Sequence, residues 1–229
     1  MSTAHALAPL LAERRLWRAG QGAVDGRGGE PSGHPALDAA LPGGGWPPAA
    51  LSELLLGLDG RGELALLLPT LARATRQGRP VAVVGPPYLP YAPALAAAGL
   101  DLAHLLLVRA EGRDALWTTE QALRSGACAA VLCWPQGVDD RGLRRLAVAA
   151  EQGGALGFAF RPRRALAQPS PAALRLEVLE DGAVRVHKCR GGAVPASPVR
   201  WRCGRAAGLA TTAPAMPRPA PPVRFPRPA

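Results

Sequence analysis

Residues 51–64 read LSELLLGLDGRGEL, an apolar run followed by a loop that contains three glycines. Gly57 and Gly62 have the spacing of a phosphate-binding loop, in which Gly, four residues and then Gly-Lys-Ser/Thr connect a strand to a helix. Glu63 occupies the position of the Lys that contacts the phosphates, and Leu64 that of the hydroxyl that ligates Mg²⁺. A glutamate repels a polyanion by roughly 1 to 4 kcal/mol at about 4 Å. The segment predicts a degenerate phosphate-binding loop that holds no cofactor, although a turn with glycines by chance explains this octapeptide equally well.

Length and composition are those of a globular protein. The 229 residues, 48% of them hydrophobic, suffice for one domain with a buried core. No apolar run reaches the length of a membrane span, and the N-terminus lacks the pattern of a signal peptide. The cysteines form no CxxC pair, which favours reduced thiols, and the histidines have no metal-ligand spacing. We therefore expect a cytoplasmic protein without a metal site or membrane contact.

The net charge of +10 is concentrated in the last third of the chain. Residues 1–157 contain 14 Arg and 14 acidic residues, whereas residues 158–229 contain 12 Arg and one Lys against three acidic residues. A genome rich in G and C would favour Arg over Lys, but it would not explain why the positive charge is concentrated in the last third of the chain. The asymmetry therefore predicts contact with a polyanion or with an acidic partner surface.

Apolar runs alternate with helical patterns along the middle of the chain, which predicts an α/β fold with a mostly parallel sheet flanked by helices. The expected strands are 51–56, 80–84, 105–109, 127–134 and 155–160, and the expected helices are 64–77, 92–99, 114–124 and 139–152. Residues 173–180 and 183–189 flank an Asp-Gly turn and predict a closing antiparallel hairpin. We expect three parts: an N-terminal helix with a Gly-rich linker (1–32), the core domain (33–192) and a basic, Pro-rich, disordered tail (193–229).

Read together, these segments resemble the RecA-like ATPase core. Residues 37–45 read LDAALPGGG, similar to the element that precedes the P-loop strand of that family. The resemblance implies that Trp134 stands where the Walker B strand ends in a Mg²⁺-orienting Asp. Residues 85–88 read GPPY, without the carboxylate that activates water, and Arg161 replaces a polar sensor. With Glu63 and Leu64, four parts of the ATP machinery are missing, so no enzymatic activity and no catalytic residue are expected.

The sequence is more specifically similar to the ImuA family, over about residues 14–192. The runs that carry this resemblance are 33–47, 86–93, 115–117, 120–126 and 160–162. Membership would imply a non-catalytic accessory protein of SOS-induced error-prone translesion DNA synthesis. Its implied partners are an ImuB-like Y-family polymerase relative and an error-prone replicative-type polymerase subunit, with single-stranded DNA or RecA as further candidates. The implied location is the bacterial cytoplasm, at the nucleoid when DNA is damaged.

A second reading follows from the same resemblance, because ImuA-type proteins are also similar to SulA. SulA is the SOS-induced inhibitor that binds the division GTPase FtsZ. A SulA-like division inhibitor is therefore the alternative function, and the identity of the captured partner separates the two.

Aromatic residues are the candidate anchors for a protein partner. Tyr88 and Tyr91 lie in a Pro-braced loop at the expected carboxyl end of the second strand, where ligands of open α/β sheets bind. We interpret them as a partner-docking pair, and local packing of a rigid loop is the alternative. Trp46 is expected to cover a sheet edge, Trp117 to lie in the core, and Trp134 to fill the space of a nucleotide.

Basic residues are the candidate contacts for DNA or a partner. The RecA resemblance places Arg161, Arg163 and Arg164 in a DNA-contacting loop after the fifth strand, where guanidinium groups suit phosphates. A solvated basic loop is the alternative. A second basic cluster is interleaved with an aromatic residue, an arrangement that favours single strands or protein. It comprises Lys188, Arg190, Arg200, Trp201 and Arg202.

Overall fold

Eight strands form one continuous sheet in the computed structural model, which describes residues 28–59 and 62–201. The strands are β1 (Leu51–Leu56), β2 (Val81–Val84), β3 (Leu105–Val108), β4 (Ala130–Cys133), β5 (Leu156–Pro162), β6 (Leu174–Val178), β7 (Ala183–Cys189) and β8 (Val199–Arg200). The helices are α2 (Pro35–Ala40), α3 (Leu68–Arg76), α4 (Ala92–Ala97), α5 (Gly112–Arg124) and α6 (Asp140–Gly153). Short 3-10 segments are η1 (Glu63–Leu66), η2 (Leu102–His104) and η3 (Arg163–Ala167).

The strand order is β3-β2-β4-β5-β1-β6-β7-β8, parallel from β3 through β6 and antiparallel from β6 through β8. The α/β architecture and the closing hairpin expected from the sequence are thus confirmed. β1 lies between β5 and β6, so that residues on three strands meet on the same face of the sheet. This central position of β1 puts its carboxyl end, and the loop after it, in the middle of the sheet edge.

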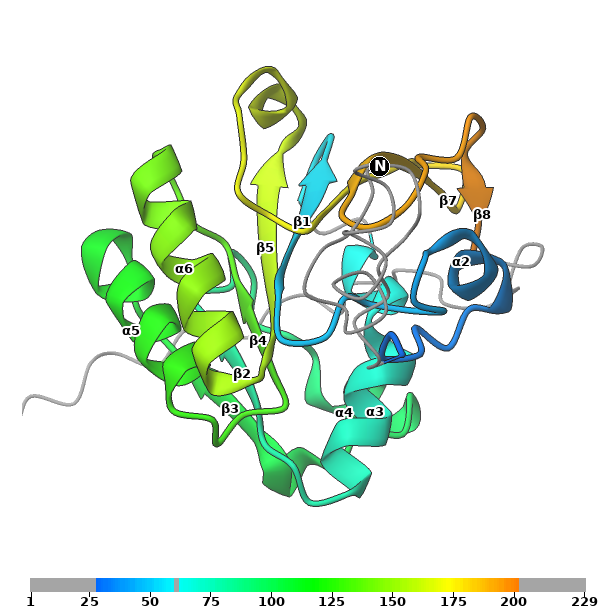
Figure 1. Ribbon diagram of the computed structural model, residues 1–229. Helices are drawn as coiled ribbons and strands as arrows, with labels where there is room; N and C mark the ends of the chain where they lie inside the picture. The colour runs from blue at the N-terminus through cyan, green and yellow to red at the C-terminus, as the bar shows by residue number, and fades with distance from the viewer. Residues whose placement is uncertain (1–27, 60–61, 202–229) are drawn as a thin grey trace, which may run out of the picture.

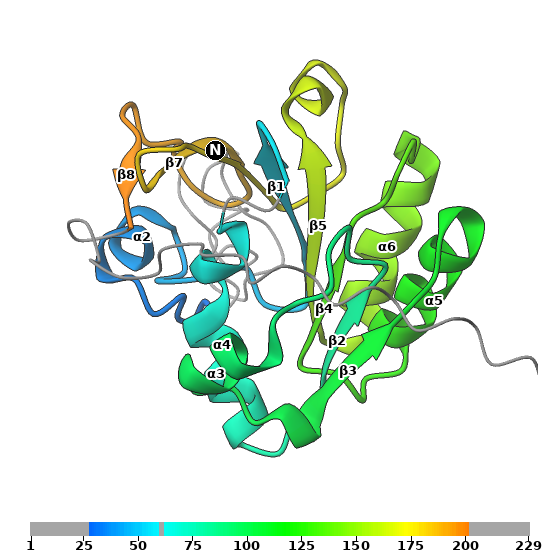
Figure 2. The ribbon, with the colours of Figure 1, turned by 180° about the vertical axis from the view of Figure 1, so that it is seen from behind.

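Helices cover both faces of the parallel part of the sheet (Figures 1 and 2). α5 and α6 lie on one face, and α2, α3 and α4 lie on the opposite side. The strands of the parallel part read as continuous apolar runs because both of their faces are buried. Leu54, Phe158 and Phe160 pack toward α3, whereas Val131 and Ala159 pack toward α5 and α6.

The single helix expected over residues 64–77 is divided in two. η1 forms a 3-10 turn directly after the glycine loop, and α3 begins only at Leu68. Pro69 explains the break, because proline lacks an N–H and is tolerated only in the first turn of a helix. The loop therefore leads into a short irregular turn rather than into the amino end of a long helix.

The antiparallel end of the sheet extends further than the sequence predicts. Gly182 has a φ of 76° in the β6–β7 turn, a conformation that glycine adopts readily. β8 pairs with β7, and the buried Trp201 packs edge-on against His34 at 5.0 Å. The sheet thus continues past residue 192, although the boundaries at 32/33 and 192/193 remain predictions. The predicted N-terminal helix and most of the predicted tail, including its expected disorder, lie outside the described residues.

Candidate functional site

The loop after β1 carries acidic and apolar side chains at the positions where a phosphate-binding loop has lysine and a hydroxyl. Gly62 adopts a left-handed φ of 87° and precedes η1. The Glu63 side chain that follows is buried, and Leu64 packs against the apolar core. Burial and, secondarily, the charge of Glu63 raise the pKa of Asp59 in the same loop. A carboxylate pair thus occupies the turn that would have to surround a phosphate.

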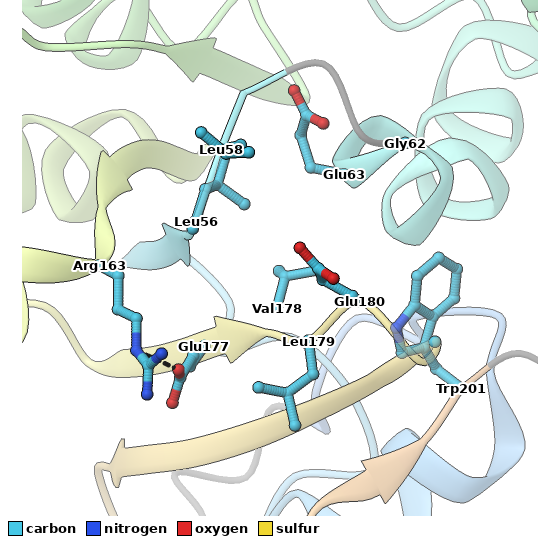
Figure 3. A pocket seen from close by; sticks show the side chains of 12 residues that line it. Leu56, Leu58, Gly62, Glu63, Arg163, Glu177, Val178, Leu179, Glu180 and Trp201 are labelled. Carbon is cyan, nitrogen blue, oxygen red and sulfur yellow. Dashed lines mark ion pairs between the residues drawn. The ribbon is translucent and has the colours of Figure 1, made fainter. Parts of the chain in front are cut away.

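A cavity of about 380 Å³ opens between this loop and the β6–β7 turn (Figure 3). Glu63 and Glu180 lie on its opposite walls. The other lining residues include Glu177, Trp201 and the apolar Leu56, Leu58, Val178 and Leu179. The buried Glu177 accepts from Arg163 Nε at 2.7 Å and pairs with His187 Nε2 at 2.9 Å. Three glutamates thus share the lining with apolar side chains, and the one arginine among the described lining residues is engaged with Glu177.

The neighbouring strand ends supply no metal ligand. Trp134 follows β4 and stacks on Phe160 of β5, with ring centroids 4.4 Å apart and planes inclined by 12°. Its buried indole fills the core at the position where the family resemblance implies a Mg²⁺-orienting Asp. Across residues 28–59 and 62–201, no group of three or more His, Cys, Asp or Glu could hold a metal ion.

A buried ion-pair network lies on the sheet face beside α6. Glu53, in the middle of β1, has no solvent exposure and accepts from Arg161 Nη1 and from Arg175 Nε, each at 2.6 Å. Both arginines also donate to residues 163–171, which we call the strap because this segment crosses the sheet face between β5 and β6. Arg161 Nη2 donates to Gln168 Oε1 at 2.8 Å, and Arg175 Nη2 donates to the Ala165 carbonyl at 2.8 Å.

This network corrects the DNA-contact role predicted for Arg161. The side chain is 5% exposed and engaged with Glu53, so its guanidinium cannot reach a phosphate. The sequence did contain a signal, because Glu53 interrupts an otherwise apolar strand, and a buried carboxylate requires a cationic partner. Arg161, which lies within β5, is thus a partner of the buried Glu53 rather than a surface contact.

The other predicted basic contacts are divided between structural and solvent-facing positions. Arg163 is exposed but paired with Glu177, and Lys188 Nζ donates to the Ser170 carbonyl at 2.8 Å. Partial burial, with the charges of Arg190 and Arg175, lowers the pKa of Lys188.

Arg164 and Arg190 are exposed and form no ion pair with any described residue. Arg200 is exposed and pairs with Asp181 at 3.2 Å. Trp201 is buried, so it does not stand beside the basic cluster as a stacking platform, and Arg202 lies outside the described residues.

A different surface presents apolar side chains to solvent. Tyr88 and Tyr91 are 65% and 66% exposed, and Leu89 between them is 64% exposed. Leu106 and Leu107 are exposed on β3, the edge strand that lies next to β2. We call these five residues the β3-edge surface. The sequence missed the two leucines because four apolar residues in a row do not reveal that their strand is at an edge.

The tryptophans only partly follow the expectations. Trp46 is fully buried, contacts Phe158 edge-on at 5.2 Å and donates to Thr70 Oγ1 at 3.0 Å. Trp117, expected in the core, is 61% exposed on α5. α5 turns Thr119 and Leu123 toward the sheet, which leaves Trp117 on the side of the helix that faces solvent. It is a further apolar feature of the surface, separate from the five residues above.

Fold and site together define a mixed α/β protein with an acid-lined crevice at the place where a phosphate-binding loop would hold phosphate. Residues 39–161, more than half of the chain, match the family model described as the MT3502 N-terminal domain, and the chain belongs to this family. It is also similar to the crystal structure of SulA from Pseudomonas aeruginosa, with 30% identity and a TM-score of 0.43 over 50% of this chain and 99% of that one. No curated protein matches the sequence. Within the described ranges, none of the helices has the length and hydrophobicity to span a membrane.

Proposed function

We propose that this chain is a non-catalytic accessory protein of SOS-induced error-prone translesion DNA synthesis. In this role it binds an ImuB-like polymerase relative and, through exposed arginines, single-stranded DNA. The proposal starts from the ImuA resemblance of residues 33–47, 86–93 and 160–162. The observation that carries it is the chemistry of the crevice after β1, which does not suit a nucleotide.

A nucleoside triphosphate brings several negative charges into the site it occupies. Here Glu63 and Glu180 line the cavity, and Glu177 beside them is already paired with Arg163. A carboxylate about 4 Å from a phosphate repels it by roughly 1 to 4 kcal/mol, and Glu63 stands where a P-loop lysine would attract it. Leu64 packs in the core where a Mg²⁺-binding hydroxyl would be needed. The scaffold therefore supports a binding role more readily than a phosphoryl-transfer role.

The β3-edge surface supports a protein partner. The outer side of β3 has no neighbouring strand in the described sheet, so its backbone groups can pair with an added strand. Leu106 and Leu107 point to opposite faces of the sheet, and pockets or side chains on both sides of an added strand could cover them. Tyr88 and Tyr91, in the loop that follows the neighbouring strand β2, supply exposed aromatic side chains, a residue type that is enriched at binding interfaces. We assign this surface to an extended segment of the ImuB-like protein.

Co-purification with the full 229-residue chain tests the proposed function. The tagged chain is expressed together with either the ImuB-like protein or the FtsZ of the same organism, under identical conditions. We expect the ImuB-like protein to be retained and FtsZ to be lost. Retention of FtsZ without the ImuB-like protein would instead favour a SulA-like division inhibitor, and retention of neither would contradict both.

A further inference from the structure

The basic residues in and around the strap divide into two groups, one buried and one exposed. Arg161 and Arg175 are buried under the strap, whereas Arg164 projects from it into solvent. The sheet face beneath the strap carries charged side chains, and the strap itself is irregular after η3.

An irregular covering segment has carbonyl groups that no helix or strand satisfies, and burial makes each of them expensive to leave unpaired. Arg175 meets this need at the Gln168 carbonyl, to which its Nη1 donates at 3.1 Å. Its Nη2 donates at 2.8 Å to the Ala165 carbonyl, which also accepts from the Gln168 backbone N–H at the end of η3. Its Nε is held by Glu53 at 2.6 Å, which fixes the direction of the guanidinium fork. Lys188 adds a bond to the Ser170 carbonyl. The strap is thus bound to the sheet at three carbonyls, those of residues 165, 168 and 170.

Arg164 lies between two of the points at which the strap is fixed. On one side, Arg163 is paired with the buried Glu177. On the other side, Ala165 is buried and its carbonyl accepts from Arg175. The backbone of the residue between them therefore has little freedom, and the Arg164 guanidinium is carried outward on a fixed base.

We propose that Glu53 and Arg175 are positioning residues that hold the strap as a preformed platform and thereby present Arg164 to the phosphates of single-stranded DNA. This inference rests on the DNA contact in the proposed function. A preformed contact loses less conformational entropy on binding than a flexible basic loop would. The buried ion pairs therefore act on DNA binding without touching DNA.

The sharpest variant is Arg175→Lys, which keeps the positive charge opposite Glu53 but cannot reproduce the guanidinium fork. Arg144→Lys is the matched control, because Arg144 is an exposed arginine that pairs with Asp140 on α6. We expect the strap amides of Arg175→Lys to exchange with solvent about tenfold faster, with α6 and β2 unchanged. Gln168→Ala, which removes the acceptor for Arg161, is expected to act in the same direction with a smaller effect. Gln136→Ala serves as its control.

Binding of an oligodeoxythymidine about 30 nucleotides long is then measured against salt concentration. Loss of one phosphate contact lowers the slope of log K against log salt by about 0.7 for single strands. We expect Arg164→Ala and Arg175→Lys each to lower the slope by that amount, and the double variant to lower it no further. A merely structural role of Arg175 would reduce the fraction of active protein and leave the slope unchanged.

The two readouts separate failure of this inference from failure of the proposed DNA contact. Unprotected strap amides in the unmodified chain would overturn the platform. Faster strap exchange in Arg175→Lys with an unchanged slope, while Arg164→Ala lowers the slope, would overturn the positioning role. An unchanged slope in Arg164→Ala, or no binding of the oligonucleotide at all, would overturn the DNA contact itself, and the exchange data would still decide whether the strap is fixed.

Discussion

The sheet around β2, β3 and β4 is apolar and is packed against α5, whereas the sheet around β1, β5 and β6 carries buried charges and is packed against the strap. A helix satisfies its own carbonyl groups, so the sheet below it can consist of apolar side chains. An irregular cover leaves carbonyls that the sheet must satisfy, and here Arg175 donates from β6 to the Gln168 carbonyl. The two regions show that the cover of a sheet face decides whether charge is tolerated on it. They also differ at their margins, since β3 is open to solvent while β6 is followed by β7 and β8.

The largest loss of stability should come from removing Glu53, the carboxylate at the centre of the charged region. Glu53→Ala leaves two buried guanidinium groups without a counter-charge, and we expect a loss of about 3 to 5 kcal/mol in the free energy of unfolding. Urea unfolding followed by circular dichroism measures this difference. Glu111→Ala, which removes an exposed carboxylate beside the helix-covered region, is the control and should change stability by less than about 0.5 kcal/mol. Equal effects of the two substitutions would refute the contrast between the regions.

A substitution on β3, the exposed edge strand of the apolar region, should lower the affinity for a partner rather than the stability of the fold. Leu107→Asp on β3 places a charge in the β3-edge surface, and we expect at least about a tenfold loss of affinity for the ImuB-like protein. Val148→Asp on α6 is a closely matched control, since Val148 is 43% exposed and Leu107 is 40% exposed. Calorimetric titration measures both affinities, with urea unfolding to verify that the variants remain folded. A similar loss for Val148→Asp, or none for Leu107→Asp, would exclude β3 as the docking strand.

The apolar region was the easier of the two to predict from sequence. Continuous apolar runs such as residues 81–84 and 130–133 favour strands buried on both faces, and Asp181-Gly182 favours a tight turn. The strand order, however, is not written in any one segment. For this reason the sequence did not predict that β3 is an edge strand, and so it did not predict the exposure of Leu106 and Leu107.

The charged region was harder, because its pairs join residues far apart in the sequence. Arg161 lies in a basic stretch and resembles a surface contact, yet its partner Glu53 is 108 positions away. Glu53 in the run LSELLL indicated that a buried carboxylate needs cationic partners, but the sequence does not indicate which arginines they are. β8 was missed for another reason: residues 195 and 198 are proline, a residue type that is depleted in strands.

A smaller effect is a pH dependence of stability that arises from the apolar environment between β4 and α5. Cys133 on β4 is buried, and burial raises the pKa of its thiol to about 12 from an ordinary value of 9.0. Above pH 9 the unfolded chain loses this proton while the folded chain keeps it, so stability present below pH 9 should fall by about 1.4 kcal/mol per pH unit toward pH 12. Unfolding measured across this range should show a shallower fall for Cys133→Ala. Rapid labelling of Cys133 by iodoacetamide in the folded chain at pH 8 would contradict the burial argument.

The smallest expected signal concerns the crevice beside the loop after β1. Titration of Mg-ATP into the chain should release no heat beyond dilution, because Glu63 repels the phosphates and Trp134 offers no ligand for the metal. Glu63→Lys combined with Leu64→Thr restores the two P-loop residues, yet we expect at most millimolar affinity. The reason is that Glu177 and Glu180 still line the cavity, and neither substitution supplies the missing acid after β4. Micromolar binding by the unmodified chain would show that the acid-lined walls rearrange around a nucleotide, and the case for a purely non-catalytic role would fail.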